Sequence, residues 1–325
     1  MKEPISGLSL FSHNMCKDGI EMARDVLIIG SGMAGLTAYN MLTKAGLSCL
    51  MLEKARGVGG RMSHRRHDLG GYDHGTSFFK VTSPIFKKFL QTYVDQGILD
   101  LDGGVAVAKP AGNNLARAMA PKEADFLAQK QVASITEDAG RLQLKDTDGV
   151  TYEGTKLLIT CPMPQAKTLL HNHWDQSWPD AGQVSYRPVV TIMATMVARG
   201  DELGLAKLMG AGNSTNLWEA DKPGRQEGHR LVVHFDEDAT MPWLQTDLKE
   251  LAGIMSRRLA DAGNQVLDLQ AHRWLYAHTK TAMDGGMLAH RDLPIWVAGD
   301  GFGLNGVESA FLSAHAAASD MIKKR

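Results

Sequence analysis

Aromatic residues, cysteines and long apolar runs are all scarce in this chain of 325 residues. Aromatic residues make up 6% of it, and there are three cysteines, Cys16, Cys49 and Cys161. No stretch approaches the roughly 18 consecutive apolar residues of a membrane-spanning helix, so we expect no membrane partner. The cysteines are widely spaced and contain no C-x-x-C pair, which indicates reduced thiols and a cytoplasmic location.

An excess of charge of one sign is also missing. The 35 Lys and Arg residues balance 36 Asp and Glu residues, which leaves a net charge of −1. Without a strong electrostatic field, we expect no nucleic-acid partner. His171 and His173 have metal-ligand side chains but no third ligand in sequence nearby, so we expect no metal site.

The first residues carry no recognisable targeting signal. Gly7–Phe11 is too short for the apolar region of a signal peptide. We expect residues 1–23 to form a disordered extension, with Met22 as an alternative start.

A glycine-rich turn dominates the part of the chain that follows. Gly30-Ser31-Gly32-Met33-Ala34-Gly35 comes between an apolar strand, Asp25–Ile29, and a helix expected over Met33–Ala45. A second strand over Leu47–Leu52 leads into Glu53. In this context the G-x-G-x-x-G spacing predicts dinucleotide binding.

Each part of the turn has a physical role. Gly30 permits a tight turn, Gly32 lets the backbone approach a pyrophosphate, and Gly35 allows close packing of helix and strand. The helix N-terminus, with Met33 and Ala34, offers unpaired N–H groups to phosphate. Glu53 is placed to accept hydrogen bonds from a ribose.

The next segment points to a flavin. Glu53 begins an E-x-x-x-x-x-G-G-R pattern that is typical of flavin-binding proteins similar to amine oxidases, and Arg61 supplies a planar cation for phosphate oxygens. We assign the cofactor-binding positions of this segment to Lys54, Arg56, Gly60, Arg61 and Met62. A solvated basic loop is the competing interpretation.

A second candidate contact with the cofactor lies near the C-terminus. The strand Ile295–Ala298 ends in Gly299-Asp300, and a helix of small residues follows over Val307–Ile322. This order resembles FAD folds of the glutathione-reductase type, in which the aspartate, here Asp300, binds the ribityl–phosphate region. The helix start at Val307 would face the flavin. An ordinary strand–turn–helix capped by Asp300 is the alternative.

Longer motifs resemble bacterial renalase-type flavoproteins. They comprise Lys54–Met62, Asp73–Phe79, Pro162–Ala166, Lys222–Arg225, His272–Ala277, Gly299-Asp300 and Val307–Ser313. The resemblance implies an amine-oxidase-like fold with p-hydroxybenzoate-hydroxylase-like architecture and noncovalently bound FAD. It also implies oxidation of the 2- and 6-dihydro isomers of NAD(P)H to NAD(P)+, with O2 as the electron acceptor.

Three departures from that family pattern fall near the expected pocket. Gly306 stands where the family has arginine before Val-Glu, and Gly75–Phe79 carries Ser77 in place of a glutamine. The segment between Gly97 and Gly112 is also shorter than the usual hairpin. We therefore expect this chain to share the fold of the renalase-type family but not necessarily its substrate.

The pattern along the chain predicts an α/β fold with two interleaved domains. We assign residues 24–80, 110–166 and 291–325 to a Rossmann-like FAD-binding domain, in which Val132 contacts adenine from a β-meander. Residues 81–109 and 167–290 form a substrate domain whose mixed sheet covers the flavin. Its expected elements are the strands Val189–Val197, Leu231–Phe235 and Val266–Tyr276 and the helix Leu248–Leu259.

The candidate catalytic residues are His272, Phe78 and Trp274, which the resemblance places on the pocket walls; a core position is the alternative for each. Hydride transfer from a dihydronicotinamide needs orientation rather than a strong base. Three functions remain open: a renalase-like oxidase, an FAD-dependent oxidase of another small molecule such as an amine or biosynthetic intermediate, and a flavin-bound partner protein without turnover.

Overall fold

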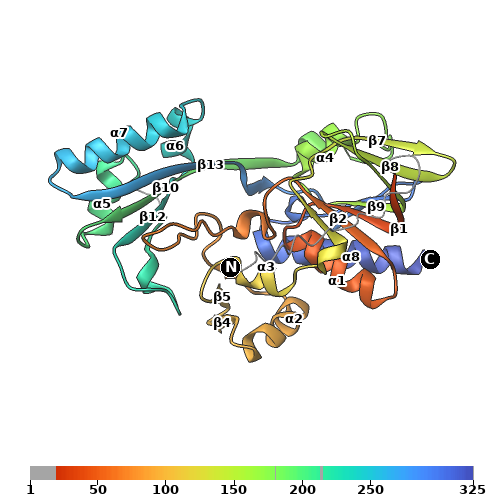
Figure 1. Ribbon diagram of the computed structural model, residues 1–325, viewed down its shortest axis with the longest axis horizontal. Helices are drawn as coiled ribbons and strands as arrows, with labels where there is room; N and C mark the ends of the chain where they lie inside the picture. Colours follow the sequence, from red (N-terminus) through yellow and green to blue (C-terminus); the bar gives the residue numbers. More distant parts are fainter. Residues whose placement is uncertain (1–19, 180, 213–214, 325) are drawn as a thin grey trace, which may run out of the picture.

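The computed structural model describes residues 20–179, 181–212 and 215–324. Two lobes lie side by side in Figure 1, and the long strands β10 (Ser185–Met196) and β13 (Val266–Thr281) run from one toward the other. The right-hand lobe holds the N-terminal strands, and the left-hand lobe holds a separate four-stranded sheet.

An eight-stranded sheet forms the right-hand lobe. Its main path is β14 (Leu288–Ala289), β15 (Ile295–Val297), β9 (Thr151–Ile159), β1 (Ile20–Ile29), β2 (Cys49–Glu53) and β6 (Phe126–Ala128). The pairs from β15 to β6 are parallel. Such strands are buried on both faces, which explains their nearly continuous apolar sequences.

Helices cover one face of this sheet and an antiparallel meander covers the other. The helices α1 (Met33–Lys44) and α8 (Gly306–Lys323) share a core with β1 and β2. The meander strands β7 (Val132–Asp138) and β8 (Arg141–Asp146) form the second core with α4 (Met163–Leu169). The predicted Rossmann-like α/β fold is confirmed.

The first domain boundary differs from our expectation. Residues 81–109 form most of a small unit that contains β3 (Phe79–Lys80), α2 (Pro84–Asp95), β4 (Leu99–Asp102) and β5 (Val105–Ala108), followed by α3 (Asn114–Ala118). The unit packs into the core of α1 and α8, where the rings of Phe86 and Phe311 are 4.8 Å apart. Its apolar side chains therefore belong to the Rossmann-like lobe, not to the substrate domain.

The second boundary also moves. Leu170 and Val184, which we expected in the substrate domain, pack into the meander core. The substrate lobe therefore begins close to β10. At the N-terminus, β1 begins at Ile20 rather than at Asp25, so residues 20–23 are part of a strand and not of the extension. Residues 1–19, and with them Cys16, lie outside the described residues.

The left-hand lobe is an antiparallel sheet covered by helices. Its strand order is β11 (Thr215–Trp218), β12 (Arg230–His234), β10 and β13. The helices α5 (Glu202–Leu208), α6 (Glu237–Thr240) and α7 (Leu248–Asp261) accompany it, and residues of α5 and α7 share its core. The three predicted strands and the long helix are confirmed, although β10 begins earlier and β13 ends later than predicted.

The remaining elements are short. Single 3-10 turns occupy Gly60–Met62, Glu123–Asp125, Ala181–Gln183, Glu219–Asp221, Met241–Trp243 and Asp300–Phe302. Within the described ranges, no helix has the length and apolarity needed to cross a bilayer.

Candidate functional site

The glycine turn has the geometry that a bound diphosphate requires. Gly30 has φ +100°, and a Cβ added to Gly35 would lie 2.0 Å from the carbonyl oxygen of Gly30. A Cβ added to Gly32 would meet no described atom within 4 Å. Gly30 and Gly35 therefore permit the close packing of β1 and α1, while the space in front of Gly32 stays open.

The N-terminus of α1 faces this space without a side-chain cap. Its first N–H groups therefore have no partner from the helix itself. Gly60, with φ +52°, brings the next loop so close that an added Cβ would lie 3.2 Å from the Cα of Gly32. The uncapped helix start and the two closely apposed glycines fit a diphosphate, as predicted for a dinucleotide.

Glu53 holds this turn together. Its carboxylate is buried and accepts hydrogen bonds from Ser31 N at 2.8 Å, Ser31 Oγ at 2.9 Å and Ala55 N at 2.7 Å. The sequence did not suggest this structural role. A carboxylate has further lone pairs for a ribose, so the predicted contact remains a prediction.

The other predicted cofactor residues differ in exposure. Lys54 and Arg56 are exposed. The side chains of Met62, Val132 and Val307 are buried in the two cores. If these three contact a cofactor, they do so mainly through their backbone atoms.

Arg61 and Asp300 are brought together from opposite ends of the chain. Arg61 donates two hydrogen bonds of 2.6 Å to the two carboxylate oxygens of Asp300 and one of 2.8 Å to the carbonyl of Tyr276. Thr279 Oγ1 donates to the same carboxylate at 3.0 Å. We predicted separate contacts with FAD for Arg61 and Asp300; the structure shows them paired with each other.

Two residues of the C-terminal motif shape the segment around Asp300. Ser313 Oγ accepts a hydrogen bond from Gly299 N at 3.0 Å, which fixes the turn before Asp300. Glu308 accepts from Thr82 N at 2.7 Å and Ser83 N at 2.9 Å at the start of α2. This part of the C-terminal motif thus joins α8 to its neighbours.

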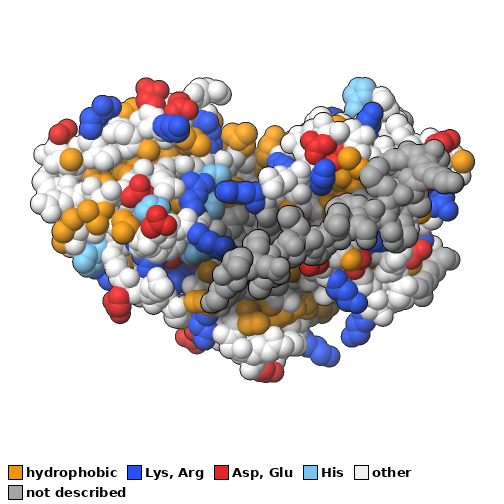
Figure 2. Space-filling view, viewed as in Figure 1, with side chains coloured by type: hydrophobic (Ala, Val, Ile, Leu, Met, Phe, Trp, Pro, Cys, Tyr) orange, Lys and Arg blue, Asp and Glu red, His pale blue; other side chains and the backbone are white. Residues whose placement is uncertain are grey.

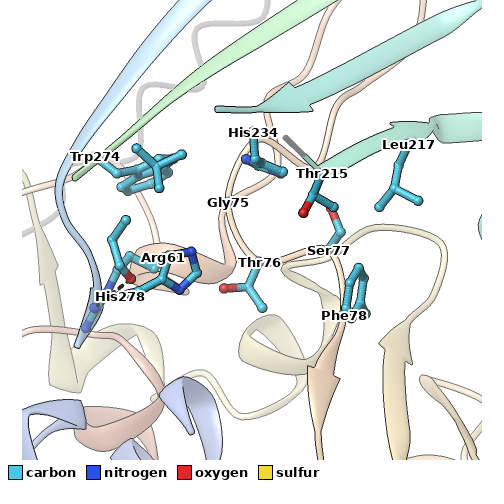
Figure 3. A pocket seen from close by; sticks show the side chains of 12 residues that line it. Arg61, Gly75, Thr76, Ser77, Phe78, Thr215, Leu217, His234, Trp274 and His278 are labelled. Atoms are coloured by element: carbon cyan, nitrogen blue, oxygen red, sulfur yellow. Dashed lines mark hydrogen bonds between the residues drawn. The ribbon is translucent and has the colours of Figure 1, made fainter. Parts of the chain in front are cut away.

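A cavity of about 170 Å³ lies between the two lobes. Figure 3 shows the side chains that converge on it. The lining consists of Arg61, Gly75, Thr76, Ser77, Phe78, Val189, Thr215, Leu217, His234, Trp274, Ala277 and His278. Phe78 and Trp274 line the cavity, whereas His272 does not line it; the catalytic role of these residues remains a prediction.

His272 instead supports the wall. Its ring lies 4.3 Å from the ring of Trp274 and 5.0 Å from the ring of His74, which itself stacks on the indole at 5.4 Å. Trp274 Nε1 donates a 2.9 Å hydrogen bond to the carbonyl of His74. Burial, with the neighbouring charge of Arg65, lowers the pKa of His74 to about 3 and that of His272 to about 4. Both rings are therefore neutral near pH 7.

Sequence reasoning missed His234 and His278. His234 ends β12 and lies 3.0 Å from Thr191 Oγ1. Desolvation lowers its pKa to about 3. Its place at the end of a predicted strand was the available signal, but only the pairing of β12 with β10 brings it to the cavity.

A buried ionic cluster stands behind the cavity loop. Asp73 accepts from Arg225 at 2.5 Å, and its Oδ1 lies 2.7 Å from His64 Nδ1. Lys222 Nζ donates to Glu219 at 2.7 Å and to Ser77 Oγ at 3.1 Å. Burial alone would raise the pKa of Asp73, but the bond with His64 and the charges of Lys222 and Arg225 lower it. Through these contacts the Lys222–Arg225 motif anchors the loop Gly75–Phe78, which lines the cavity.

No group of three His, Cys, Asp or Glu side chains in the described part of the chain is arranged to hold a metal ion. The site comprises the open diphosphate cradle, the Arg61–Asp300 pair and a cavity walled by aromatic rings, hydroxyl groups and neutral imidazoles.

Known proteins have a similar fold or share a segment of this sequence. A 38% identical segment of 61 residues, 18% of this chain, matches an L-amino acid oxidase of Cerastes cerastes but spans only 12% of that relative. Two solved structures superpose on 93% of this chain and 99% of their own. One is a protein from Exiguobacterium sp. 255-15 assigned as a protoporphyrinogen oxidase (TM-score 0.64, 12% identity), and the other is a redesigned triple mutant of putrescine oxidase (TM-score 0.61, 13% identity).

Family profiles match almost all of the site. Residues 28–93 match the NAD(P)-binding Rossmann-like domain, and residues 76–322 match the flavin containing amine oxidoreductases. The second match spans well over half of the chain and includes both Trp274 and Asp300. The chain therefore belongs to the family of flavin-containing amine oxidoreductases, which implies an oxidoreductase with a flavin cofactor.

Proposed function

We propose that this protein is a renalase-like oxidase that binds FAD noncovalently and oxidises the 2- and 6-dihydro isomers of NAD(P)H to NAD(P)+, with O2 as the final acceptor. The observation that carries the proposal is the chemistry of the cavity wall. Among the described lining residues there is no aspartate or glutamate, and the pKa of His234 is lowered to about 3 by desolvation. The cavity is therefore poor in general bases.

Hydride donors suit such a cavity. FAD, when bound, would supply the two-electron acceptor. The chain would then orient the donor ring between aromatic walls and exclude water. Phe78 and Trp274 provide flat apolar faces, and Thr76, Ser77 and Thr215 provide hydroxyl groups. These hydroxyls are able to bond a carboxamide without changing charge.

Amine oxidation is the second candidate, and one observation favours it. Phe78 and Trp274 present aromatic faces to the same cavity, and such faces attract a substrate cation. An amine must lose its proton before it is oxidised, however, and a histidine with a pKa near 3 is a weak acceptor for that proton. We therefore rank the dihydronicotinamide first.

The cellular compartment of the protein is a further part of this proposal. Cys49 and Cys161 are free thiols in the structure. Free thiols suit a reducing compartment, and we propose the cytoplasm.

The test is anaerobic stopped-flow absorbance near 450 nm on the FAD-loaded protein. We expect rapid bleaching by the dihydro isomers and negligible bleaching by putrescine or L-amino acids, with colour returning under air. Bleaching by an amine but not by the isomers would replace this function with the second candidate. A yellow protein that no donor reduces would indicate a flavin-bound partner protein without turnover.

A further inference from the structure

Arg65 presents its guanidinium to the strand that forms one wall of the cavity. A backbone bridge to Tyr72, with N–O distances of 2.8 and 2.9 Å, fixes its position on the loop. The side chain donates to Gln270 Oε1 at 3.1 Å and lies 3.5 Å from His272 Nδ1. Both contacts are to uncharged groups on β13.

Three other cations around the site are paired with acids. Arg61 binds Asp300, Lys222 binds Glu219, and Arg225 binds Asp73. Within the described ranges, no carboxylate lies at ion-pair distance from Arg65.

The surroundings of Arg65 leave its charge uncompensated. The nearest acid along β13, Asp268, is instead 3.3 Å from His67 and accepts from Gln270 at 3.1 Å. Partial burial and the like charge of Arg56 lower the pKa of Arg65, although an arginine stays protonated near neutral pH. A half-buried cation beside a second cation favours an external anion.

This cation is close to the cavity. Gln270, His272 and Trp274 alternate along β13, so their side chains share one face of the strand. Two residues along a strand span about 7 Å, and Trp274 lines the cavity. Arg65 therefore lies about one such step beyond the wall, within reach of a substrate whose oxidised ring occupies the cavity. Figure 2 shows Lys, Arg and His side chains gathered beside the hollow between the lobes.

His74 adds a second sign of an unfilled polar site. Its side chain is 6% exposed, and its Nδ1 has no hydrogen-bond partner among the described residues. Its ring meets the edge of His272 at 5.0 Å. A buried polar atom of this kind calls for a partner, and a ligand that reaches Arg65 would pass beside it.

We propose that Arg65, Gln270, His272 and His74 form an anion-binding subsite that holds an acidic group of the substrate, a phosphate or a carboxylate. The proposal rests on the cavity being the substrate site, as proposed above. A dihydronicotinamide nucleotide would place its phosphate here, and an organic acid would place its carboxylate.

The test measures anion binding by isothermal titration calorimetry on the FAD-loaded protein, so that the diphosphate cradle at α1 is already filled. The probes are inorganic pyrophosphate and succinate at low and high salt. Arg65→Gln removes the charge and Arg65→Lys retains it. Arg66→Gln is the matched control, because Arg66 is the adjacent arginine and is exposed. Flavin occupancy and melting temperature establish that each variant is folded.

We expect Arg65→Gln to weaken pyrophosphate binding at least tenfold and to reduce its salt dependence, with partial recovery in Arg65→Lys and less than a twofold change in Arg66→Gln. Equal binding by Arg65→Gln and the unaltered protein, or no binding of either probe, would overturn the subsite. Arg65-dependent binding of succinate alone would support the subsite but assign it to a carboxylate, against the dihydronicotinamide proposal. Arg65-dependent binding of pyrophosphate, in a protein that dihydro isomers fail to reduce, would likewise support the subsite while rejecting that function.

Discussion

Arg61 and Asp300 are separated by 239 residues, yet they form a two-pronged ion pair in which both nitrogen–oxygen distances are 2.6 Å. The pair closes the Rossmann-like lobe, because Arg61 follows the glycine loop after β2 and Asp300 follows β15. Arg61 also donates to the carbonyl of Tyr276 on β13. One guanidinium thereby connects the glycine loop, the turn after β15 and the substrate sheet.

Asp300→Asn should weaken both folding and flavin retention. The change leaves Arg61 without its charged partner, and losing one partner of a buried pair costs about 3–5 kcal/mol. Because the Arg61 side chain is 29% exposed, solvent screening reduces this to about 1–3 kcal/mol. Urea unfolding and flavin absorbance per protein would measure both effects. Asp292→Asn, in an exposed pair with Arg291, should change neither.

His74 should make the protein sensitive to mild acid. Its pKa is lowered to about 3 by burial, with His272 and Arg65 adding to the effect, whereas an unfolded histidine has a pKa near 6.5. The unfolded state therefore binds the extra proton between these values, so stability is full above about pH 6.5 and falls as the pH drops toward 3.

This dependence is measurable by urea unfolding between about pH 6 and pH 4.5, above the range in which Asp73 titrates. His74→Gln should reduce the slope of stability against pH by up to about 1.4 kcal/mol per pH unit. His171→Gln is the control, since His171 is exposed. An unchanged slope in His74→Gln would mean that this ring is not the neutral buried group described here.

Glu308→Ala should loosen the unit that follows β3. The substitution removes the acceptor of Thr82 N and Ser83 N at the start of α2. Both donors are only partly buried, so water is able to replace part of the lost acceptor and the cost should be about 1–2 kcal/mol. Thermal unfolding would show the loss, and hydrogen exchange should be fastest in α2. The exposed Glu137→Ala should leave both unchanged.

The backbone conformation of Gly306 disfavours the arginine that the renalase-type pattern has at this position. Its φ is +44°, and an added Cβ would meet no described atom. Space is therefore available, but a side chain in the left-handed region costs about 1–2 kcal/mol. Gly306→Ala should show this cost alone in urea unfolding.

Comparison of Gly306→Arg with Gly306→Ala then isolates the effect of the charge on substrate turnover. A large gain in turnover of dihydro-NAD over the alanine variant would mean that the unaltered pocket has lost specificity for that substrate. Equal turnover in the two variants would make this departure from the renalase pattern irrelevant to specificity.

Trp274→Phe should raise the KM of the substrate roughly tenfold. The change removes the hydrogen bond to the carbonyl of His74 and part of the stack with His74 and His272. Together these contribute about 1–2 kcal/mol. Trp243→Phe, on the far side of the substrate sheet from the cavity lining, should leave KM unchanged. An unaltered KM in Trp274→Phe would remove the indole from the substrate wall.

The sequence by itself was sufficient for the opening strand, glycine turn, helix and second strand of the Rossmann-like lobe. The glycines at 30, 32 and 35, the apolar strands around them and the acidic residue at the end of β2 act over short distances. Turn geometry and period-two or period-3.6 patterns determine such elements, and these are local properties. The long strands and helix of the substrate lobe were predicted for the same reason.

Only the tertiary structure decided where the side chains of the site meet. Nothing local pairs Arg61 with Asp300, brings His234 to the cavity or leaves Arg65 without an acid. These arrangements depend on strand pairing within the substrate sheet and on contacts between residues far apart in the sequence. The same holds for residues 81–109, because Phe86 packs against Phe311 of α8, which lies more than two hundred residues further along the chain. A pattern of apolar residues indicates that one face of an element is buried. Only the packing of the whole chain determines which other element covers that face.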